Sequence, residues 1–533
     1  MMSPCRFFRV FTLHPNLLLV AFIALALVPP GAVVRAGVEQ APVSFHNDVR
    51  PILVERCQGC HQPAKALGKF VLTSYALLME GGKSDDSIVV AGKPDESLLV
   101  MEITPEDGEA AMPKNDEPLS GGQIELIRRW ISEGAVDDSP ASAGPQISME
   151  HPPVYENLPV VTSLDYSPDG KLLAVAGFHE VLLHDVSGGS DPVGRLVGLS
   201  ERIQSVKFSP DGKWLAVSGG IPTVMGEVQV WDVAKRKLRV SKVLTFDTIY
   251  GASWSSDSKL LAFGCADNSV RVIEAKSGKE VLFQGAHSDW VLATVFSVDS
   301  SHLVSVSRDR SMKLIQVETQ QFIDNITSIT PGALKGGLMT VDCHPKEDWL
   351  AVGGADGVPK IYRMHRQKAR KVGDDFNLIQ RFTALPGRMF AIQFHPDGSR
   401  FVAGSSYNLS GEVRAYAVGG EEFVAEAEAS AKERDNAVER RERARPEKKD
   451  GEPLWTLAVP SAIYAVAYSP DGQTVAATGF AGKVFLIDAE KGTLRSELLS
   501  VPAALISRVA SRAAAAPAAD KPPKKAKTRR RRL

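Results

Sequence analysis

The sequence is poor in cysteine, in aromatic residues and in any excess of charge of one sign. It has 5 cysteines in 533 residues, 7% aromatic residues, and 62 Lys+Arg against 63 Asp+Glu. So few cysteines exclude a disulfide-rich scaffold, and 44% hydrophobic residues exclude a mainly disordered or collagen-like chain. Because the total charge is balanced, nucleic acid is not an expected partner.

The near-zero net charge hides an uneven distribution. Residues 521–533 hold eight Lys/Arg and no acid, so residues 1–520 keep 54 basic against 63 acidic groups. The Ala-, Pro-, Lys- and Arg-rich tail over 504–533 is predicted to be disordered. On an exported protein, this basic tail would suit an anionic surface or an acidic redox partner, and a merely solubilising tail is the alternative.

The N-terminus has the layout of a secretory signal. Two arginines precede the 12-residue apolar run 17–28, and the small-residue site Val34–Ala36 precedes a cleavage point at Gly37. A membrane anchor is the alternative, but twelve residues are fewer than the ~20 that span a bilayer. We therefore predict a signal peptide over 1–36 and a soluble mature protein in the periplasm or another extracytoplasmic compartment.

Residues 57–61 read Cys-Gln-Gly-Cys-His, the C-x-x-C-H pattern by which c-type haem is attached. Two thiols on one turn reach the two porphyrin vinyl groups, and His61 follows them as the proximal iron ligand. A redox-active disulfide would need a βαβ context, and a zinc site would need a second pair of ligands nearby; neither follows in the sequence. The motif therefore predicts one haem c, covalently tethered by Cys57 and Cys60.

Two amphipathic segments flank the motif. The first predicts a helix running into it, with Asp48 as its N-cap and Pro51 in its first turn. The second predicts a helix within 119–135, capped by Ser120 and closed by Gly134. The apolar face of the first helix is formed by Phe45, Val49, Ile52 and Leu53. The segment 37–136 is therefore predicted to be a small all-α cytochrome c domain.

The sixth iron ligand is expected from the loop between these helices. Met112 lies in a polar loop before Pro113, where its thioether is free to turn to the iron, and Met/His ligation raises the haem potential. Met79 and Met101 follow apolar runs and are predicted to pack in the core. His46 is the alternative ligand, but it lies within the first predicted helix and is predicted to face solvent. Met112 is therefore the predicted distal ligand.

These residues give the stretch 43–135 a likeness to a known family. It resembles the planctomycete-type cytochrome c domain, and the resemblance implies haem c with His61 and Met112 as axial ligands. The sequence departs from the family pattern after Met112, where Lys-Asn-Asp replaces the more usual Pro/Gly-rich run. The matching segments are 49–53, the C-x-x-C-H motif, 92–99, Met112-Pro113, 127–131 and 134–135.

Beyond a linker over 137–153, the chain repeats a unit of apolar strands joined by a Ser-Pro-Asp-Gly-like turn. The unit recurs seven times, at steps of 42 to 74 residues, and two histidines replace the serine as predicted turn residues. A charged insertion over 421–452 accounts for the longest step and is predicted to be a solvated helix. The turns begin at Ser167, Ser209, Ser255, Ser297, His344, His395 and Ser469.

These repeats resemble the WD-repeat family, whose period is about 40–45 residues with four strands per blade. Trp231-Asp232 is the one literal Trp-Asp pair. The resemblance implies an all-β, seven-bladed propeller over 154–503. The whole chain is thus predicted to be multidomain, a small all-α cytochrome c domain followed by this propeller.

Two sets of reactive side chains in the repeats receive a structural interpretation. His287, Ser305 and Asp309 have the residue types of a hydrolase triad, but the WD-repeat resemblance implies hydrogen bonds that brace a blade, and no G-x-S-x-G elbow is present. Cys265 and Cys343 lie in apolar strands and are predicted to be buried thiols rather than a disulfide.

Together these features predict an exported c-type cytochrome that transfers electrons through its haem to redox protein partners that the sequence does not name. The propeller is predicted to be a platform for docking other proteins. Whether the chain is an enzyme stays open. One alternative is a propeller oxidoreductase that passes substrate electrons to the cytochrome, although the propeller sequence shows no evident metal or quinone site. The other is a haem-based sensory or scaffolding protein.

Overall fold

The computed structural model describes residues 41–83, 87–114, 116–139, 147–189, 191–327, 335–369, 375–419 and 450–501. The predicted signal peptide, the predicted tail over 504–533 and residues 421–449 of the predicted insertion lie outside these ranges. The chain divides into two compact units, Met1–Pro42 and Val43–Leu533, and every helix and strand described below belongs to the second. No helix in the described ranges is long and apolar enough to cross a membrane.

The first part of this unit is mainly helical. One short antiparallel sheet interrupts it, so the domain is not purely α as the sequence predicted. The strands of this sheet are β1 (His61–Gln62) and β2 (Lys65–Ala66). The helices are η1 (Phe45–Val49), α1 (Arg50–Arg56), η2 (Leu67–Lys69), α2 (Tyr75–Glu80), η3 (Pro94–Glu96), α3 (Leu98–Ile103) and α4 (Gly121–Ser132).

The two flanking helices begin at side chains that satisfy free backbone N–H groups. In α4 the predicted cap is confirmed: Ser120 and Gln123 form a reciprocal capping box. In the first helical segment the predicted cap, Asp48, is wrong. The hydroxyl of Ser44 accepts from the N–H of Asn47 at 2.9 Å, and Asp48 instead accepts from the N–H of Ser44 at 2.9 Å. The cap lies one turn earlier because Ser44 is the last residue with extended backbone.

An aromatic cluster joins the first helical segment to the last. The rings of Phe45 and Trp130 lie 5.2 Å apart, and Tyr75 packs edge-on against Phe45, also at 5.2 Å. Trp130 is only 1% exposed, and its indole N–H donates to the carbonyl oxygen of Val136 at 3.0 Å. The apolar face predicted for the first helix is confirmed, since its four residues are all buried in the core of this domain.

From residue 164 onward, the described chain is built of antiparallel sheets. One sheet has seven strands because the 15-residue β6 pairs with β5 through its first part and with β7 through its last part. The strands of this sheet are β3 (Leu164–Tyr166), β4 (Leu172–Ala176), β5 (Phe178–Asp185), β6 (Gly194–Phe208), β7 (Trp214–Ile221), β8 (Met225–Asp232) and β9 (Lys237–Thr245).

Five further sheets have four strands each, hydrogen-bonded in chain order. Three of them are β10 (Ile249–Trp254), β11 (Leu260–Cys265), β12 (Val270–Glu274) and β13 (Glu280–Gln284); β14 (Val291–Phe296), β15 (His302–Ser307), β16 (Met312–Gln316) and β17 (Phe322–Asn325); and β18 (Leu338–Cys343), β19 (Trp349–Gly354), β20 (Lys360–Arg363) and β21 (Leu378–Arg381). The last two are β22 (Arg388–Phe394), β23 (Arg400–Ser406), β24 (Gly411–Ala417) and β25 (Pro453–Val459); and β26 (Ile463–Tyr468), β27 (Thr474–Gly479), β28 (Lys483–Asp488) and β29 (Leu494–Leu499).

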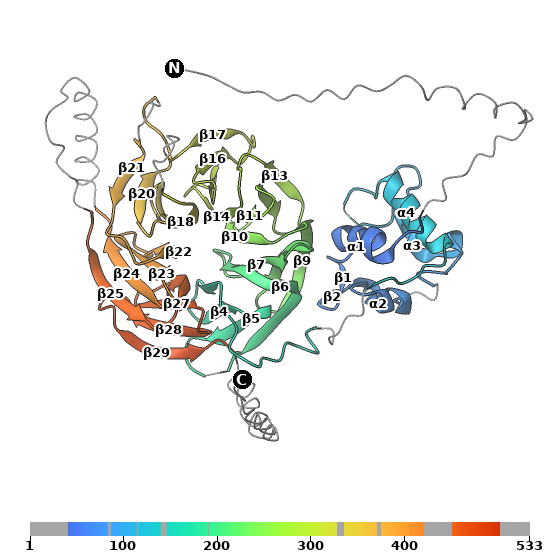
Figure 1. Ribbon diagram of the computed structural model, residues 1–533, viewed down its shortest axis with the longest axis horizontal. Coiled ribbons are helices and arrows are strands. Elements are labelled where there is room, and N and C mark those ends of the chain that lie inside the picture. The colour runs from blue at the N-terminus through green and yellow to red at the C-terminus, as the bar shows by residue number, and fades with distance from the viewer. Residues whose placement is uncertain are drawn as a thin grey trace, which may run out of the picture. The chain divides into compact units, whose positions relative to one another are not determined.

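The sheets stand radially around one axis (Figure 1). The innermost strands contact one another in the order β3, β6, β10, β14, β18, β22 and β26, and β26 returns to contact β3. The ring is therefore closed, which is the arrangement of a β-propeller. A shared apolar cluster, including Leu164 and Tyr166 on one side and Ala467 and Val484 on the other, joins the last sheet to the first.

The repeated turns are held by side chains of the turn itself. In all five serine turns the hydroxyl donates to the aspartate two residues later, at 2.5–2.7 Å. The two histidines are turn residues, as predicted, and also reach the next turn: His344 lies 3.1 Å from the carbonyl oxygen of Gly398, and His395 lies 3.2 Å from that of Gly472. A Cβ added at Gly472 would lie 2.1 Å from the His395 ring, and its φ of +70° favours glycine as well.

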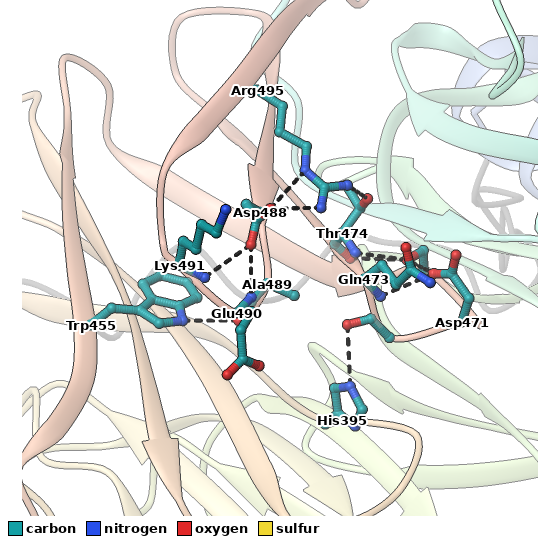
Figure 2. Close-up of polar contacts among 12 residues, drawn as sticks. His395, Trp455, Asp471, Gln473, Thr474, Asp488, Ala489, Glu490, Lys491 and Arg495 are labelled. Atoms are coloured by element: carbon teal, nitrogen blue, oxygen red, sulfur yellow. Dashed lines mark hydrogen bonds and ion pairs between the residues drawn. The ribbon is translucent and has the colours of Figure 1, made fainter.

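A polar network lies within the last sheet and joins it to the preceding sheet (Figure 2). Asp488 accepts from the Arg495 guanidinium at 2.8 Å and from the backbone N–H groups of Glu490 and Lys491. The indole N–H of Trp455, on the adjacent sheet, donates to the carbonyl oxygen of Ala489 at 2.9 Å. The hydrogen bonds from Arg495 and the two backbone groups hold the pKa of Asp488 near 2.

Candidate functional site

The Cys57–His61 motif forms a tight turn at the end of α1. The N–H of Cys57 still bonds to the carbonyl oxygen of Leu53 at 3.0 Å, as in the helix. The carbonyl oxygen of Cys57 then accepts from the N–H of Cys60 at 3.1 Å and from that of His61 at 3.2 Å. The structure therefore brings both thiols and the imidazole together on one turn.

The two thiols of the motif are free but lie in different surroundings. Cys57 packs against the apolar core of the helical domain, and burial raises the pKa of its thiol to about 12. The ammonium of Lys65 donates a hydrogen bond to the sulfur of Cys60 at 3.6 Å. Neither thiol is bonded to another cysteine, so both are available as thioether tethers.

His61 presents a neutral, partly enclosed imidazole. Its ring lies 5.0 Å from the ring of Phe70, and burial lowers the pKa of the imidazole. Its Nδ1 atom is buried without a hydrogen-bond partner. The neutral form is the one that ligates a metal ion, so the surroundings of His61 suit a ligand.

The structure separates Met112 from the other two candidate methionines. Met112 is half-buried and packs against the same core as Cys57, and its N–H donates to the carbonyl oxygen of Glu102 at 2.9 Å. The prediction that Met79 and Met101 are core residues is wrong, because they are 36% and 53% exposed. On the six-residue α3, the inward face is taken by Leu99, Val100 and Ile103. Met112 thus remains the methionine that shares a core with the motif.

Buried polar atoms without a partner gather around the motif. Seven such side-chain atoms fall between residues 46 and 73, and two of them belong to Gln62, which is 0% exposed. Another is the Nδ1 atom of His46, which is half-buried rather than facing solvent as predicted. Because buried polar groups are normally hydrogen-bonded, this concentration suits a cofactor that carries polar groups of its own.

The donor set therefore fits a haem. It offers two free thiols, one imidazole and one thioether, which are the groups that hold a c-type haem and its iron. In the described part of the chain, no three His, Cys, Asp or Glu side chains are grouped to hold a metal ion by themselves. The residues would then hold iron only together with the porphyrin, with Cys57, Cys60, His61 and Met112 as the contacting residues.

The structure does bring His287, Ser305 and Asp309 together. The His287 ring lies 2.9 Å from Asp309 through Nδ1 and 2.8 Å from Ser305 through Nε2. Ser305 is 0% exposed, so no substrate could reach its hydroxyl. Hydrogen bonds from the imidazole and from Ser311 hold the pKa of Asp309 far below its usual range, although burial opposes them. The prediction of a bracing network is thereby supported.

The other two described cysteines are free, as predicted. Cys265 is 0% exposed, and burial raises the pKa of its thiol to about 12. Cys343 is only half-buried, so its predicted burial is wrong in degree. Its thiol lies 3.8 Å from the carbonyl oxygen of Glu347.

Comparison with protein families assigns both parts of the chain. Residues 57–116 match the model described as planctomycete cytochrome C. Four segments, 190–223, 240–274, 278–316 and 451–488, match the model of the WD domain, G-beta repeat. The chain carries a cytochrome c-like domain and WD40 repeats. The ring of antiparallel sheets is consistent with those repeats, and the cytochrome family suggests haem binding at the Cys57–His61 turn.

Curated relatives match over part of the chain. A ribosome biogenesis protein WDR12 homolog from Chlamydomonas reinhardtii is 30% identical over 145 residues, which is 25% of this chain and 33% of that protein. A eukaryotic translation initiation factor 3 subunit I from Coccidioides immitis is 27% identical over 162 residues, which is 29% of this chain and 45% of that protein. The chain thus spans about a third to a half of the length of these relatives.

Sequence reasoning missed the buried glutamines beside the motif. Gln58 and Gln62 are 6% and 0% exposed, yet glutamine is usually a surface residue. A glutamine inside a stretch predicted to be irregular gives no sign of burial. Their position within and directly after the motif is the one signal that could have pointed to them.

Proposed function

We propose that this protein is an exported c-type cytochrome that carries single electrons through one covalently bound haem. The observation that carries the proposal is the Cys57–His61 turn, where two free thiols and a neutral imidazole meet beside a small apolar core. When bound, the haem supplies a one-electron iron couple. The match of residues 57–116 to the planctomycete cytochrome C model supports this function.

The residues of the chain would divide the work at the site. Cys57 and Cys60 would tether the haem through thioether bonds, and His61 and Met112 would ligate its iron. The core residues around Cys57 and Met112 exclude water, and a dry site with a thioether ligand favours the reduced form of the iron. None of these residues needs to move a proton during electron transfer.

The WD40 repeats would form one seven-bladed propeller that docks protein partners. Five four-stranded sheets and one seven-stranded sheet support this count, because the shared β6 can serve as the last strand of one blade and the first of the next. The domain boundaries follow: signal 1–36, cytochrome domain 37–136, linker 137–153, propeller 154–503 and tail 504–533. A redox protein would be the partner, and the 521–533 charges would favour an anionic surface.

A haem stain of the protein after denaturing electrophoresis tests the central claim. The wild-type protein, expressed with export and cytochrome maturation, is expected to stain. The Cys57→Ser/Cys60→Ser double variant is expected to lose all stain, because no thioether can form. Cys343→Ser is the matched control, since it removes a half-buried thiol outside the motif and is expected to stain like the wild type.

Two outcomes would count against the proposal. If the wild-type protein does not stain although a co-expressed cytochrome matures normally, covalent haem attachment is excluded. A stained double variant would place the attachment at other residues. Cell fractionation of the same cultures tests export, because the proposal requires the stained protein outside the cytoplasm.

A further inference from the structure

The innermost strands of all seven repeats enclose a cavity of about 570 Å³ on the axis of the ring. Most of its wall is neutral. It contains aliphatic side chains such as Leu292 and Met339, and the aromatic rings of Phe390 and Tyr464, which pack edge to face at 5.2 Å. Of the residues that line it, only Lys207 and Asp342 carry charge.

These two charged residues differ in their partners. The ammonium of Lys207 pairs with the carboxylate of Asp165, which lies just behind the wall, at 3.1 Å. Asp342 makes no direct ion pair among the described residues, although the charge of Lys207 also acts on its carboxylate. With Asp165, Lys207 and Asp342 all ionised, the axis of the ring therefore carries one uncompensated negative charge.

Asp165 and Asp342 occupy the same place in their repeats, two residues before the turn. Each uses one carboxylate oxygen to brace the next repeat: Asp165 accepts from the N–H of Phe208 and Asp342 from that of Phe394, both at 2.8 Å. The brace explains why a carboxylate stands at each position. It does not explain why Lys207 forms its direct ion pair with Asp165 and not with Asp342, which borders the cavity.

Three of the hydroxyl groups along the wall are already used within the fold. Ser163 and Ser205 accept from backbone N–H groups of neighbouring repeats, at 3.0 Å and 3.1 Å, and Thr294 donates to the carbonyl oxygen of Gly251 at 3.0 Å. A ligand would therefore find one carboxylate without a direct ion pair, on a wall that also holds aromatic, aliphatic and uncharged polar side chains. A carboxylate in such surroundings favours a cation, because an unpaired charge away from bulk water is costly.

We propose that the axial cavity binds a small organic cation, an alkylammonium or alkylguanidinium, whose head pairs with Asp342 and whose carbon chain lies along the aromatic wall. Aromatic faces attract such cations as well. A divalent metal ion is disfavoured, since the described residues offer no group of three ligating side chains here. An anion is disfavoured because Lys207 is already paired. This inference does not depend on the haem.

Isothermal titration of the full-length protein with n-butylammonium chloride, in low salt at neutral pH, tests the proposal. Binding is expected, with butanol and butyrate as size-matched controls that do not bind. Asp342→Asn keeps an oxygen for the N–H of Phe394 and is expected to weaken binding about tenfold or more, the effect of one charge-assisted hydrogen bond. Lys207→Met leaves Asp165 unpaired as well and is expected to tighten binding.

The proposal is overturned if butanol or butyrate binds as well as n-butylammonium, or if folded Asp342→Asn binds like the wild type. Absence of binding by n-butylammonium, phenethylammonium and propylguanidinium at about 10 mM also overturns it. Thermal melting of each variant shows whether it is folded. If Lys207→Met does not fold, Asp342→Asn alone decides.

Discussion

The helical domain and the ring of sheets differ in how closely their buried polar atoms without hydrogen-bond partners are grouped. In the helical domain, seven buried polar atoms without partners gather between residues 46 and 73, around the haem motif. In the ring such atoms are scattered over the sheets, for example the Nδ1 of His184 and the hydroxyls of Ser405 and Tyr468. The serines, aspartates and histidines of the turns bond to one another and to the next repeat. The polar groups of the ring hold the fold together, whereas those of the helical domain suit an added cofactor. As evidence for a functional site, the triad-like set in the ring is therefore weaker than the buried Nδ1 atom of His61, which has no hydrogen-bond partner.

Replacing Met112 gives the largest expected effect, because it removes the proposed distal iron ligand. In the haem-loaded protein, Met112→Ala is expected to lose the low-spin Met/His features of the reduced absorption spectrum. Met101→Ala is the matched control: Met101 lies on α3 of the same domain but is 53% exposed, so its spectrum should not change. An unchanged Met112→Ala spectrum would move the distal ligand to another residue and weaken the contrast between the two regions.

Replacing Trp130 tests whether the helical domain has a core of its own. Trp130→Ala is expected to cost about 3–5 kcal/mol of unfolding free energy, as for other buried aromatic residues. In calorimetry of the full chain, the transition of the helical domain should move to lower temperature while that of the ring stays in place. A common shift of both transitions would show that the two regions unfold together.

The acidity of Asp342 gives a pH dependence to the ring. Burial raises the pKa of this carboxyl from 3.8 to about 6, against the opposing effects of the Phe394 N–H and Lys207. Between these values the folded protein holds more protons than the unfolded chain, so the free energy of unfolding falls as pH rises from about 4 to about 6. Asp342 accounts for a loss of at most about 3 kcal/mol of unfolding free energy over this range.

Urea unfolding at several pH values between 4 and 7 measures this dependence. Asp342→Asn is expected to flatten the decline. Asp471→Asn is the matched control, because hydrogen bonds lower the pKa of that turn aspartate and its contribution runs in the opposite direction with pH. A decline that persists in Asp342→Asn would mean that another buried group is responsible.

Replacing Ser305 gives the smallest expected effect. Ser305→Ala leaves the buried Nε2 of His287 without the hydroxyl that lies 2.8 Å away, which costs about 1–3 kcal/mol. Ser277→Ala, at an exposed serine, should change stability by less than about 0.5 kcal/mol. Hydrolysis of a simple ester should be the same in all three proteins. An esterase activity that disappears with Ser305 would instead restore the triad interpretation.

Elements set by local pattern could be predicted from the sequence. Phe45, Val49, Ile52 and Leu53 share one buried face because helical periodicity determines it, and Ser120 caps α4 because Gln123 stands three residues later. The serine turns follow from their own short-range hydrogen bonds. The motif at Cys57 predicts two thiols and an imidazole close together, and the structure places them on one turn.

Features that depend on distant contacts could not be predicted in this way. Met101 follows an apolar run, but a helix as short as α3 has room for only one buried face, and three neighbours already fill it. The axial cavity could not be predicted because its charged residues, Lys207 and Asp342, belong to repeats far apart in sequence. Only closure of the ring brings them to one wall.

The seven-stranded sheet has a mechanical consequence for the ring. The continuous β6 ties the first two repeats together through one unbroken backbone. On its other side the first repeat contacts the last, and the two share no strand in the described chain. They are held by apolar packing, by the hydrogen bond from the Val161 N–H to the Gly479 carbonyl oxygen at 3.0 Å, and by the contact of His184 with Ser500. If the ring is pulled at its two ends, we expect the contact between the first and last repeats to separate before any sheet unfolds. The first repeat should then remain attached to the second.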